Sequence, residues 1–146
     1  MPTSVTSDGV TLHYTDEGSG QPVVLIAGFT ASAETWQLQR SALLAADHRV
    51  PGLDRRSHGA SANPVYGQRI ARHGKDIRDV VGRVAVPSLF IGGRESQLWP
   101  CEHATAAAAT HSRATTLTIE DSGHGVNVDQ PDRVDEALLK FLAGLA

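Results

Sequence analysis

One histidine of the sequence stands where a general base could work. His124 lies between Gly123 and Gly125 in the segment IEDSGHGVNVDQP. The segment follows a strand-like run and precedes a helix that a proline opens, so we expect a turn at the end of a sheet strand. Such a turn exposes an imidazole, and bare glycines let a substrate approach closely. His124 is the best candidate for a general base, although from the pattern alone a surface histidine without a chemical role is the more common interpretation.

Three further side chains could take part in acid–base or nucleophilic chemistry. Glu95 and Ser96 follow a second strand-like run, in IGGRES. A carboxylate can hold an imidazole in one tautomer, and a hydroxyl beside a base can act as a nucleophile. Neighbours in the chain cannot easily both face one imidazole, and an exposed glutamate with a capping or loop serine is the alternative. Cys101 opens a predicted helix, whose dipole would favour its thiolate, although a buried and inert cysteine is more common.

The composition limits the class of protein. A chain of 146 residues with 40% apolar content fits a single globular domain over residues 1–146. Its net charge of −3, with acids and bases scattered, gives no basic stripe for nucleic acid or an anionic membrane. The apolar run Val23–Phe29 is too short to span a bilayer, and the first residues lack the parts of a signal peptide. We therefore expect a cytoplasmic protein that binds neither nucleic acid nor membranes.

The sequence contains no pattern typical of a metal or nucleotide cofactor. Its seven histidines form no HxH or HExxH arrangement. The glycine pairs in GSG and IGG are too short for a dinucleotide fingerprint, and there is no phosphate loop. A single cysteine excludes a disulfide within the chain. We expect no metal and no cofactor.

Strands and helices are predicted to alternate along the chain. Alternating and then continuously apolar residues in GVTLHYTDEGSGQPVVLIAG predict a surface strand followed by a buried one at Val23–Ala27. Further strands are predicted near His48–Leu53, where Pro51 and Gly52 weaken the pattern, and at Val84–Ile91 and Thr115–Ile119. Helices are predicted at Ala33–Ala46 with Ser32 as the cap, at Arg69–Val81, from Pro100 onward and at Asp132–Leu145. This order predicts a parallel sheet covered on both faces, a three-layer α/β sandwich.

Four segments, in the same order, resemble those of the α/β-hydrolase family. VVLIAGFTASAETW resembles the third strand and oxyanion loop, GLDRRSHGAS the loop after the fourth strand, VPSLFIGGRES the strand before the catalytic acid, and DSGHGVNVDQPDRVDEALLKFL the histidine loop with its helix. The resemblance implies an α/β-hydrolase fold with His124 as the base and Glu95 as the acid. It implies an oxyanion hole at Gly28 and Phe29, and a structural role for the loop bearing Asp54, Arg56 and His58.

The sequence departs from this family at its centre. No serine has a glycine two residues before and two after it, so the GxSxG nucleophile elbow is absent. Only GR separates Val81 from Val84, where the elbow strand, the next strand and the lid should lie. We therefore expect a shortened fold in which the strand at Val84–Ile91 lies beside Val23–Ala27. The turn after it would then take the place of the elbow, and Ser96 could replace the lost nucleophile.

Two hypotheses for the function follow. The first is a hydrolase of small carboxylic esters or lactones, with His124 as general base and either Ser96 or water as the nucleophile. The alternative is a non-catalytic remnant of the fold or a binding module. Removal of a central strand leaves an edge that a second copy could cover, so both hypotheses predict a homodimer.

Overall fold

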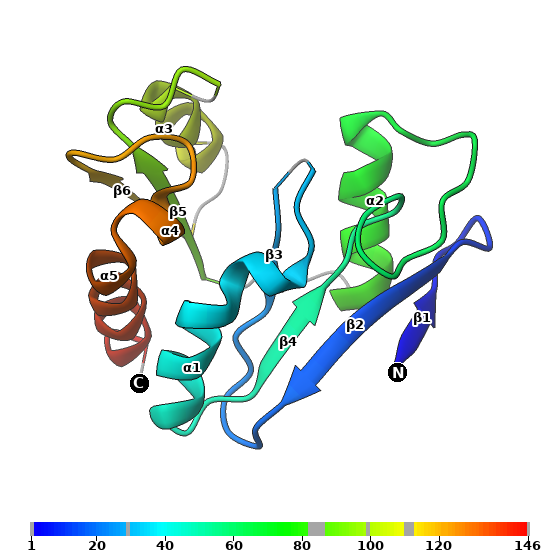
Figure 1. Ribbon diagram of the computed structural model, residues 1–146, viewed down its shortest axis with the longest axis horizontal. Helices are drawn as coiled ribbons and strands as arrows, with labels where there is room; N and C mark the ends of the chain where they lie inside the picture. Colours follow the sequence, from blue (N-terminus) through cyan, green and yellow to red (C-terminus); the bar gives the residue numbers. More distant parts are fainter. Residues whose placement is uncertain (1, 29, 82–86, 99, 110–112, 146) are drawn as a thin grey trace. The chain divides into compact units, whose positions relative to one another are not determined.

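The computed structural model describes residues 2–28, 30–81, 87–98, 100–109 and 113–145 (Figure 1). These residues form two compact units, Met1–Val84 and Ala85–Ala146, which we describe separately. The expected single domain over residues 1–146 stays a prediction. The expected pairing of Val84–Ile91 with Val23–Ala27 would join the two units and also stays a prediction, and Val84 itself lies outside the described residues.

The first unit contains a mixed four-stranded sheet. Its order is β1 (Thr3–Val5), β2 (Thr11–Glu17), β4 (Val50–Leu53), β3 (Leu25–Ile26). Here β2 runs antiparallel to β1 and β4, whereas β3 is parallel to β4. The α/β class is confirmed, but this sheet is mixed and not the parallel sheet expected. The short connection between β1 and β2 requires an antiparallel hairpin, and β2 also pairs antiparallel with β4. The strand predicted near His48–Leu53 is confirmed as β4, which pairs with strands on both sides in spite of Pro51 and Gly52.

The predicted helix after β3 is present, but it begins differently from the expectation. A 3₁₀ turn, η1 (Ala33–Trp36), leads into α1 (Gln37–Ala45). Ser32 occupies the cap position, yet its hydroxyl makes no capping hydrogen bond. The N–H of Ala33 donates instead to Asp54 Oδ1 at 2.7 Å. A carboxylate distant in the sequence thus accepts the hydrogen bond of the first N–H group of the helix. Capping rules, which consider only neighbouring residues, do not predict such a contact.

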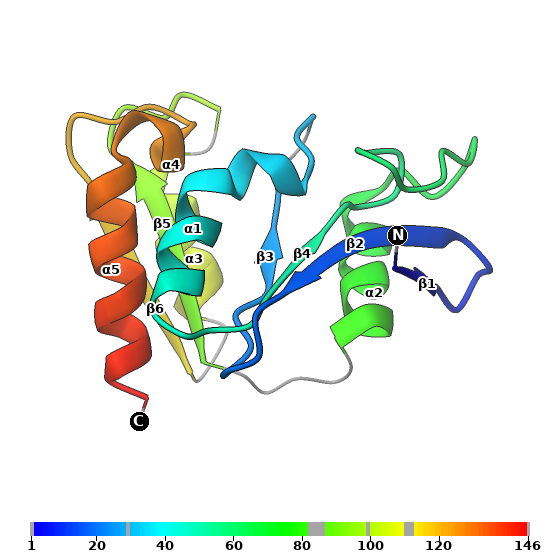
Figure 2. The ribbon, with the colours of Figure 1, turned by 60° about the horizontal axis from the view of Figure 1, so that its bottom comes forward.

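Helical elements lie over opposite faces of this sheet (Figure 2). The side chains of Leu12 and Leu53 face α2 (Ile70–Val81), whose Ile77 and Val80 pack against them. On the other face, Gly52 lies so close to η1 that an added Cβ would be 3.1 Å from the Ala33 side chain. Neighbouring residues of a strand point to opposite faces, so β4 contributes to both contacts. The loop after β4 contacts both helical elements, η1 through Asp54 and α2 through Arg56.

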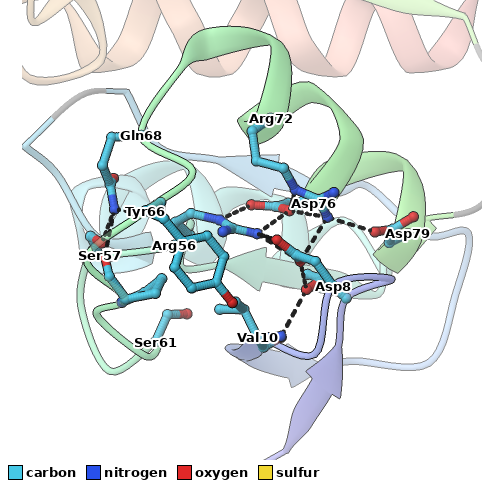
Figure 3. Close-up of polar contacts among 12 residues, drawn as sticks. Asp8, Val10, Arg56, Ser57, Ser61, Tyr66, Gln68, Arg72, Asp76 and Asp79 are labelled. Carbon is cyan, nitrogen blue, oxygen red and sulfur yellow. Dashed lines mark hydrogen bonds and ion pairs between the residues drawn. The ribbon is translucent and has the colours of Figure 1, made fainter.

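A buried ion-pair network fixes that loop against α2 (Figure 3). Arg56 has no exposed surface, and its Nε and Nη2 atoms donate to the Asp76 carboxylate at 2.7 and 2.8 Å. Nη2 also donates to Asp8 at 3.0 Å, and Arg72 bridges Asp8, Asp76 and Asp79. The hydrogen bond from Arg56 is the main reason that the pKa of Asp8 falls to about 2. The bond with Asp76 correspondingly raises the pKa of Arg56.

The second unit is a βαβ unit with a closing helix. Strands β5 (Ser88–Gly93) and β6 (Ala114–Ile119) are parallel, and α3 (Cys101–Ala109) connects them. A short helix, α4 (Val126–Asp129), and the long α5 (Pro131–Ala143) follow β6. The predicted strands and helices of this half are confirmed with shifts of a few residues. Among the described residues, no helix is both long and apolar enough to cross a membrane.

Each face of the two-stranded sheet in this unit contacts a helix. Ile91 and Ile119 pack with Val134 and Leu138 of α5. Gly92 faces α3, where an added Cβ would lie 3.8 Å from Cys101. The apolar side chains of α5 thus cover this face of the sheet. The carboxyl ends of β5 and β6 remain for the two loops that carry Ser96 and His124.

We predict that Asp76→Asn destabilises the first unit strongly. The substitution leaves the fully buried Arg56 guanidinium facing a neutral amide, and breaking a buried pair from one side costs about 3–5 kcal/mol. Urea unfolding measures the change. Asp16→Asn is the matched control, because the Arg49–Asp16 pair is more exposed and such pairs contribute little to stability. Equal losses in the two variants would contradict the role assigned to burial.

Candidate active site

Two loops meet at the carboxyl ends of the parallel strands β5 and β6. The strands end in register, with Gly93 opposite Ile119. Backbone hydrogen bonds then continue beyond the sheet, from the Arg94 N–H to the Ile119 carbonyl and from the Glu95 N–H to the Ser122 carbonyl, both at 2.9 Å. Loops at this end of parallel strands commonly form binding and catalytic sites. The residues of IGGRES and of the histidine loop are therefore held together by main-chain contacts.

Gly93 allows the closest approach between the two loops. A Cβ on this residue would lie 2.0 Å from the Gly123 carbonyl oxygen and 2.5 Å from that of Ser122. Both contacts are with backbone atoms, so no side-chain movement could relieve them. The histidine loop is held from its other side as well, because the Gly123 N–H donates to Asp129 Oδ2 of α4 at 2.9 Å. The conformation before His124 is thus set by β5 and α4 together.

The structure brings Ser96 and His124 into contact. Ser96 Oγ lies 3.2 Å from His124 Nδ1, within hydrogen-bonding distance. Ser96 is buried, with 7% of its surface exposed, whereas His124 is exposed. Glu95 is exposed too, and within the described residues the side chain that contacts the His124 ring is that of Ser96. The role of Glu95 as the acid, which no such contact supports, stays a prediction.

The direction of this hydrogen bond decides which atom of His124 can accept a proton. If Nδ1 carries the hydrogen, it donates to Ser96 Oγ and leaves the lone pair of Nε2 available. If Nδ1 carries the lone pair, it accepts the Ser96 hydroxyl and could activate that oxygen as a nucleophile. In Ser-His-Asp sites the nucleophile contacts Nε2, and the group that orients the ring contacts Nδ1. By this comparison, Ser96 occupies the position of an orienting group.

An exposed ion pair lies beside this contact. The guanidinium of Arg94 donates to the Glu120 carboxylate at 2.9 and 3.1 Å. This hydrogen bond is the main reason that the pKa of Arg94 is raised and that of Glu120 lowered. Both side chains are about half exposed, so the pair contributes little to stability. Arg94 also donates to Cys101 Sγ at 3.3 Å; that thiol is buried, which does not favour a nucleophile.

The segment expected to form an oxyanion hole lies in the first unit. Phe29 is outside the described residues, and the Gly28 carbonyl accepts a hydrogen bond from the Ala31 N–H at 3.4 Å. Between them Thr30 has a φ of 66°, a left-handed conformation that is uncommon for a residue other than glycine. Its N–H donates to His58 Nε2 at 3.0 Å. The proposed roles of Gly28 and Phe29 stay predictions.

The loop after β4 supports this segment. The Asp54 carboxylate accepts hydrogen bonds from the backbone N–H groups of Ala33 and Ala60 at 2.7 and 3.0 Å, and it contacts His13 Nδ1 at 3.0 Å. Burial raises the pKa of Asp54, but these hydrogen bonds outweigh it and leave the pKa below its usual value. The contacts are structural in kind. His13 was not foreseen as a partner, because nothing in its local sequence points to Asp54.

A pocket of about 650 Å³ in the first unit was missed by the sequence analysis. Its polar lining comes from Thr30, Ser32, Ser57, His58 and Gln68. These residues belong to separate segments, and no spacing rule connects them. The polar composition of DRRSHGAS was the available signal, but it was interpreted only as a loop.

No metal centre accompanies these features within the part of the chain that the structure describes. Groups of at least three His, Cys, Asp or Glu side chains that could hold a metal ion do not occur among those residues.

Comparisons with known proteins place the chain in one family. No family model matches the sequence. The non-heme chloroperoxidase CPO-A1 of Kitasatospora aureofaciens is 31% identical over 146 residues, which cover 94% of this chain and 52% of that protein. A non-heme haloperoxidase of Rhodococcus erythropolis is 30% identical, with 75% of this chain and 42% of that protein covered. A pimeloyl-[acyl-carrier protein] methyl ester esterase of Xanthomonas axonopodis is 40% identical over 70 residues, 48% of this chain and 28% of that protein.

Solved structures give the same result for the fold. An esterase from Exiguobacterium antarcticum matches with a TM-score of 0.85 and 16% identity, over 97% of this chain and 98% of that one. A bromoperoxidase from Bacillus anthracis matches with a TM-score of 0.80 and 16% identity, over 97% and 100% of the two chains. The chain belongs to the α/β-hydrolase family. This α/β-hydrolase spans about half the length of the first curated relative that it matches.

We predict that Gly93→Ala disrupts the site of this α/β-hydrolase. The added methyl group would overlap two backbone carbonyl oxygens, so either β5 or the histidine loop must move. Overpacking of this kind costs about 1–3 kcal/mol, which urea unfolding would detect. Gly125→Ala is the matched control on the same loop, because an added Cβ there meets nothing within 4 Å. Similar stability of the two variants would show that the close approach at Gly93 is unimportant.

Proposed function

We propose that this α/β-hydrolase cleaves small carboxylic esters or lactones with His124 as the general base. The observation that carries the proposal is the contact of 3.2 Å between Ser96 Oγ and His124 Nδ1 at the carboxyl ends of β5 and β6. A ring held by one nitrogen has a defined orientation, and the exposed position of His124 leaves it open to a substrate. Relatives that are called methyl ester esterases support an ester as the substrate class.

Water is the nucleophile that the geometry favours. Ser96 is buried, so a carbonyl carbon could reach its hydroxyl only after a local rearrangement. It also contacts Nδ1, the nitrogen at which other triads hold the orienting group. The proposed arrangement has Nδ1–H donating to Ser96 Oγ, with the Nε2 lone pair facing solvent. Ser96 as a direct nucleophile is the alternative, and it requires the opposite tautomer.

The proposed reaction has two proton transfers. Nε2 of His124 removes a proton from water while the water oxygen attacks the carbonyl carbon, which forms the new C–O bond and an oxyanion. The bond to the alkoxide then breaks, and the protonated Nε2 returns the proton to the departing oxygen. The products are a carboxylic acid and an alcohol, or a hydroxy acid from a lactone. Backbone N–H groups at Gly28 and Phe29 are proposed as the oxyanion donors, and Glu95 as an additional carboxylate near the imidazolium.

A non-catalytic role is the second candidate, and one observation favours it. The sequence has no GxSxG elbow, so the nucleophile of the family has been lost. In that case His124 would be an exposed side chain without turnover, and the fold would serve for binding. The homodimer expected from the sequence is compatible with either function and remains a proposal, for which light scattering at high concentration is the direct test.

The test of the proposed function compares ester hydrolysis by single-residue variants. Wild type should hydrolyse p-nitrophenyl acetate above the buffer rate, and His124→Ala should lose about 10²–10⁴-fold, the usual contribution of a general base. Ser96→Ala should lose only about tenfold if its hydroxyl orients the ring, the value of one hydrogen bond. A loss with Ser96→Ala as large as with His124→Ala would instead establish a serine nucleophile.

Controls must separate a site from ordinary imidazole catalysis. His48→Ala removes another partly exposed histidine, whose Nδ1 atom contacts the Gln21 carbonyl. It should leave the rate unchanged, and Cys101→Ala should do the same because that thiol is buried. Equal rates for wild type, His124→Ala and His48→Ala would overturn the proposal and favour the non-catalytic role.

A further inference from the structure

The outer edge of β6 has no strand beside it among the described residues. The sheet of the second unit contains β5 and β6, which pair without interruption from Ser88 opposite Ala114 to Gly93 opposite Ile119. This continuous register contains no bulge, so β6 is a regular strand over its whole length. The edge of such a strand presents backbone N–H and C=O groups to which another strand can bind.

Hydrogen bonds at the two ends of the strand pair show which groups of β6 point outward. The Ser88 N–H donates to the Arg113 carbonyl, and the Arg94 N–H donates to the Ile119 carbonyl, both at 2.9 Å. Along a strand, the backbone groups of successive residues point alternately to one neighbour and to the other. The odd-numbered residues of β6 therefore bond to β5. The groups that point away from β5 belong to Ala114, Thr116 and Thr118.

The sequence of β6 does not protect this edge. Natural edge strands are commonly protected by lysine, proline, a bulge or a very short length. The residues ATTLTI of β6 include no charged residue, no proline and no glycine. Their threonines and isoleucine are β-branched, which favours an extended strand. The edge is therefore suited to pairing with another strand.

Leu117 is an exposed apolar side chain in the middle of this edge, with 37% of its surface accessible. It lies on the same face of β6 as Ile119, which packs against Val134 of α5. An antiparallel strand whose pairing is centred on Leu117 would cover this side chain. Because the backbone groups of Leu117 bond to β5, it would occupy a non-hydrogen-bonded pair, in which the two Cα atoms are only about 4.5 Å apart.

The charges at the two ends of β6 favour a second copy of this chain as that strand. Arg113 precedes β6 and Asp121 follows it, and both are exposed. An antiparallel pair centred on Leu117 brings Arg113 of each copy to the level of Asp121 of the other. A parallel pair in register would place like charges side by side. Opposite charges across two strands are stabilising, whereas like charges are destabilising.

We propose that two copies of this chain associate through the outer edges of β6, in an antiparallel pair centred on Leu117. Thr116 of each copy then exchanges backbone hydrogen bonds with Thr118 of the other, and the two Leu117 side chains meet at a two-fold axis. The two short sheets thereby become one continuous sheet. The proposal assigns the expected homodimer to β6, and not to the edge left by the missing central strands. It does not depend on the hydrolase function.

Disulfide formation tests the register of the pair. All cysteine variants carry Cys101→Ala, which removes the native thiol. Leu117→Cys places two thiols in the central pair, where the Cα separation lies within the range of about 4.4–6.8 Å that disulfides need. We expect a covalent dimer on a non-reducing gel after mild oxidation. Thr115→Cys would face Ile119 of the second copy, and Leu139→Cys is equally exposed, at 36%, on α5; both should remain monomeric on the gel.

Charged substitutions test the association without a covalent bond. Sedimentation velocity of wild type over a concentration series should show a monomer–dimer equilibrium. Leu117→Lys and Leu117→Glu should each weaken it by about tenfold or more, because like charges then meet in the central pair. An equimolar mixture of the two variants should associate again. Leu139→Lys is the matched control for charge and exposure, and its effect should stay below about twofold.

Three results would overturn the proposal. They are a wild type that stays monomeric at every concentration, equal disulfide formation by the three cysteine variants, and equal dimer affinity of Leu117→Lys and Leu139→Lys. Far-ultraviolet circular dichroism checks that the charged variants are folded, and association of their mixture excludes misfolding as the cause of their separate losses. Ester hydrolysis is not a readout of this test, so its absence would leave the interface unaffected.

Discussion

The close pairing of β5 and β6 at their carboxyl ends is the constraint on which the candidate active site depends. Parallel register brings Gly93 level with Ile119, and hydrogen bonds to the Ile119 and Ser122 carbonyls extend the pairing into the loops. A side chain at Gly93 would collide with the backbone before His124. Main-chain contacts therefore position the two loops, and this brings the Ser96 hydroxyl into contact with the His124 imidazole. The same logic explains why residues 28 positions apart need no sequence motif to be neighbours.

In the first unit, charged side chains hold the loop after β4 in place. The Asp54 carboxylate accepts hydrogen bonds from the Ala33 and Ala60 N–H groups, and Arg56 ties the same loop to α2 through Asp76. Arg55, the residue between them, has none of these carboxylate partners within the described part of the chain. The two adjacent arginines therefore differ in their environment, because Arg56 is paired and fully buried whereas Arg55 is partly exposed and contacts the His58 ring.

The sequence predicts more of the fold than of the site. Periodicity and turn residues located the strand before IGGRES, the strand before the histidine loop and the last helix, because local patterns encode them. The antiparallel hairpin at the start and the central position of β4 depend on pairing across the chain, so local rules missed them. The family resemblance suggested Glu95 as the partner of His124, whereas in the structure Ser96 Oγ contacts His124 Nδ1. Which of two neighbouring side chains faces the ring depends on the turn geometry after Gly93, and residue type does not reveal it.

The most direct test of the account is the tautomer of His124 at neutral pH. Two-bond ¹H–¹⁵N NMR spectra distinguish a ring nitrogen that carries hydrogen from one with a lone pair, and His124→Gln assigns the signals. We predict hydrogen on Nδ1, which donates to Ser96, and a lone pair on Nε2, with this preference lost in Ser96→Ala. The opposite tautomer in wild type would contradict a water-activating Nε2 and would make Ser96 the group that His124 activates.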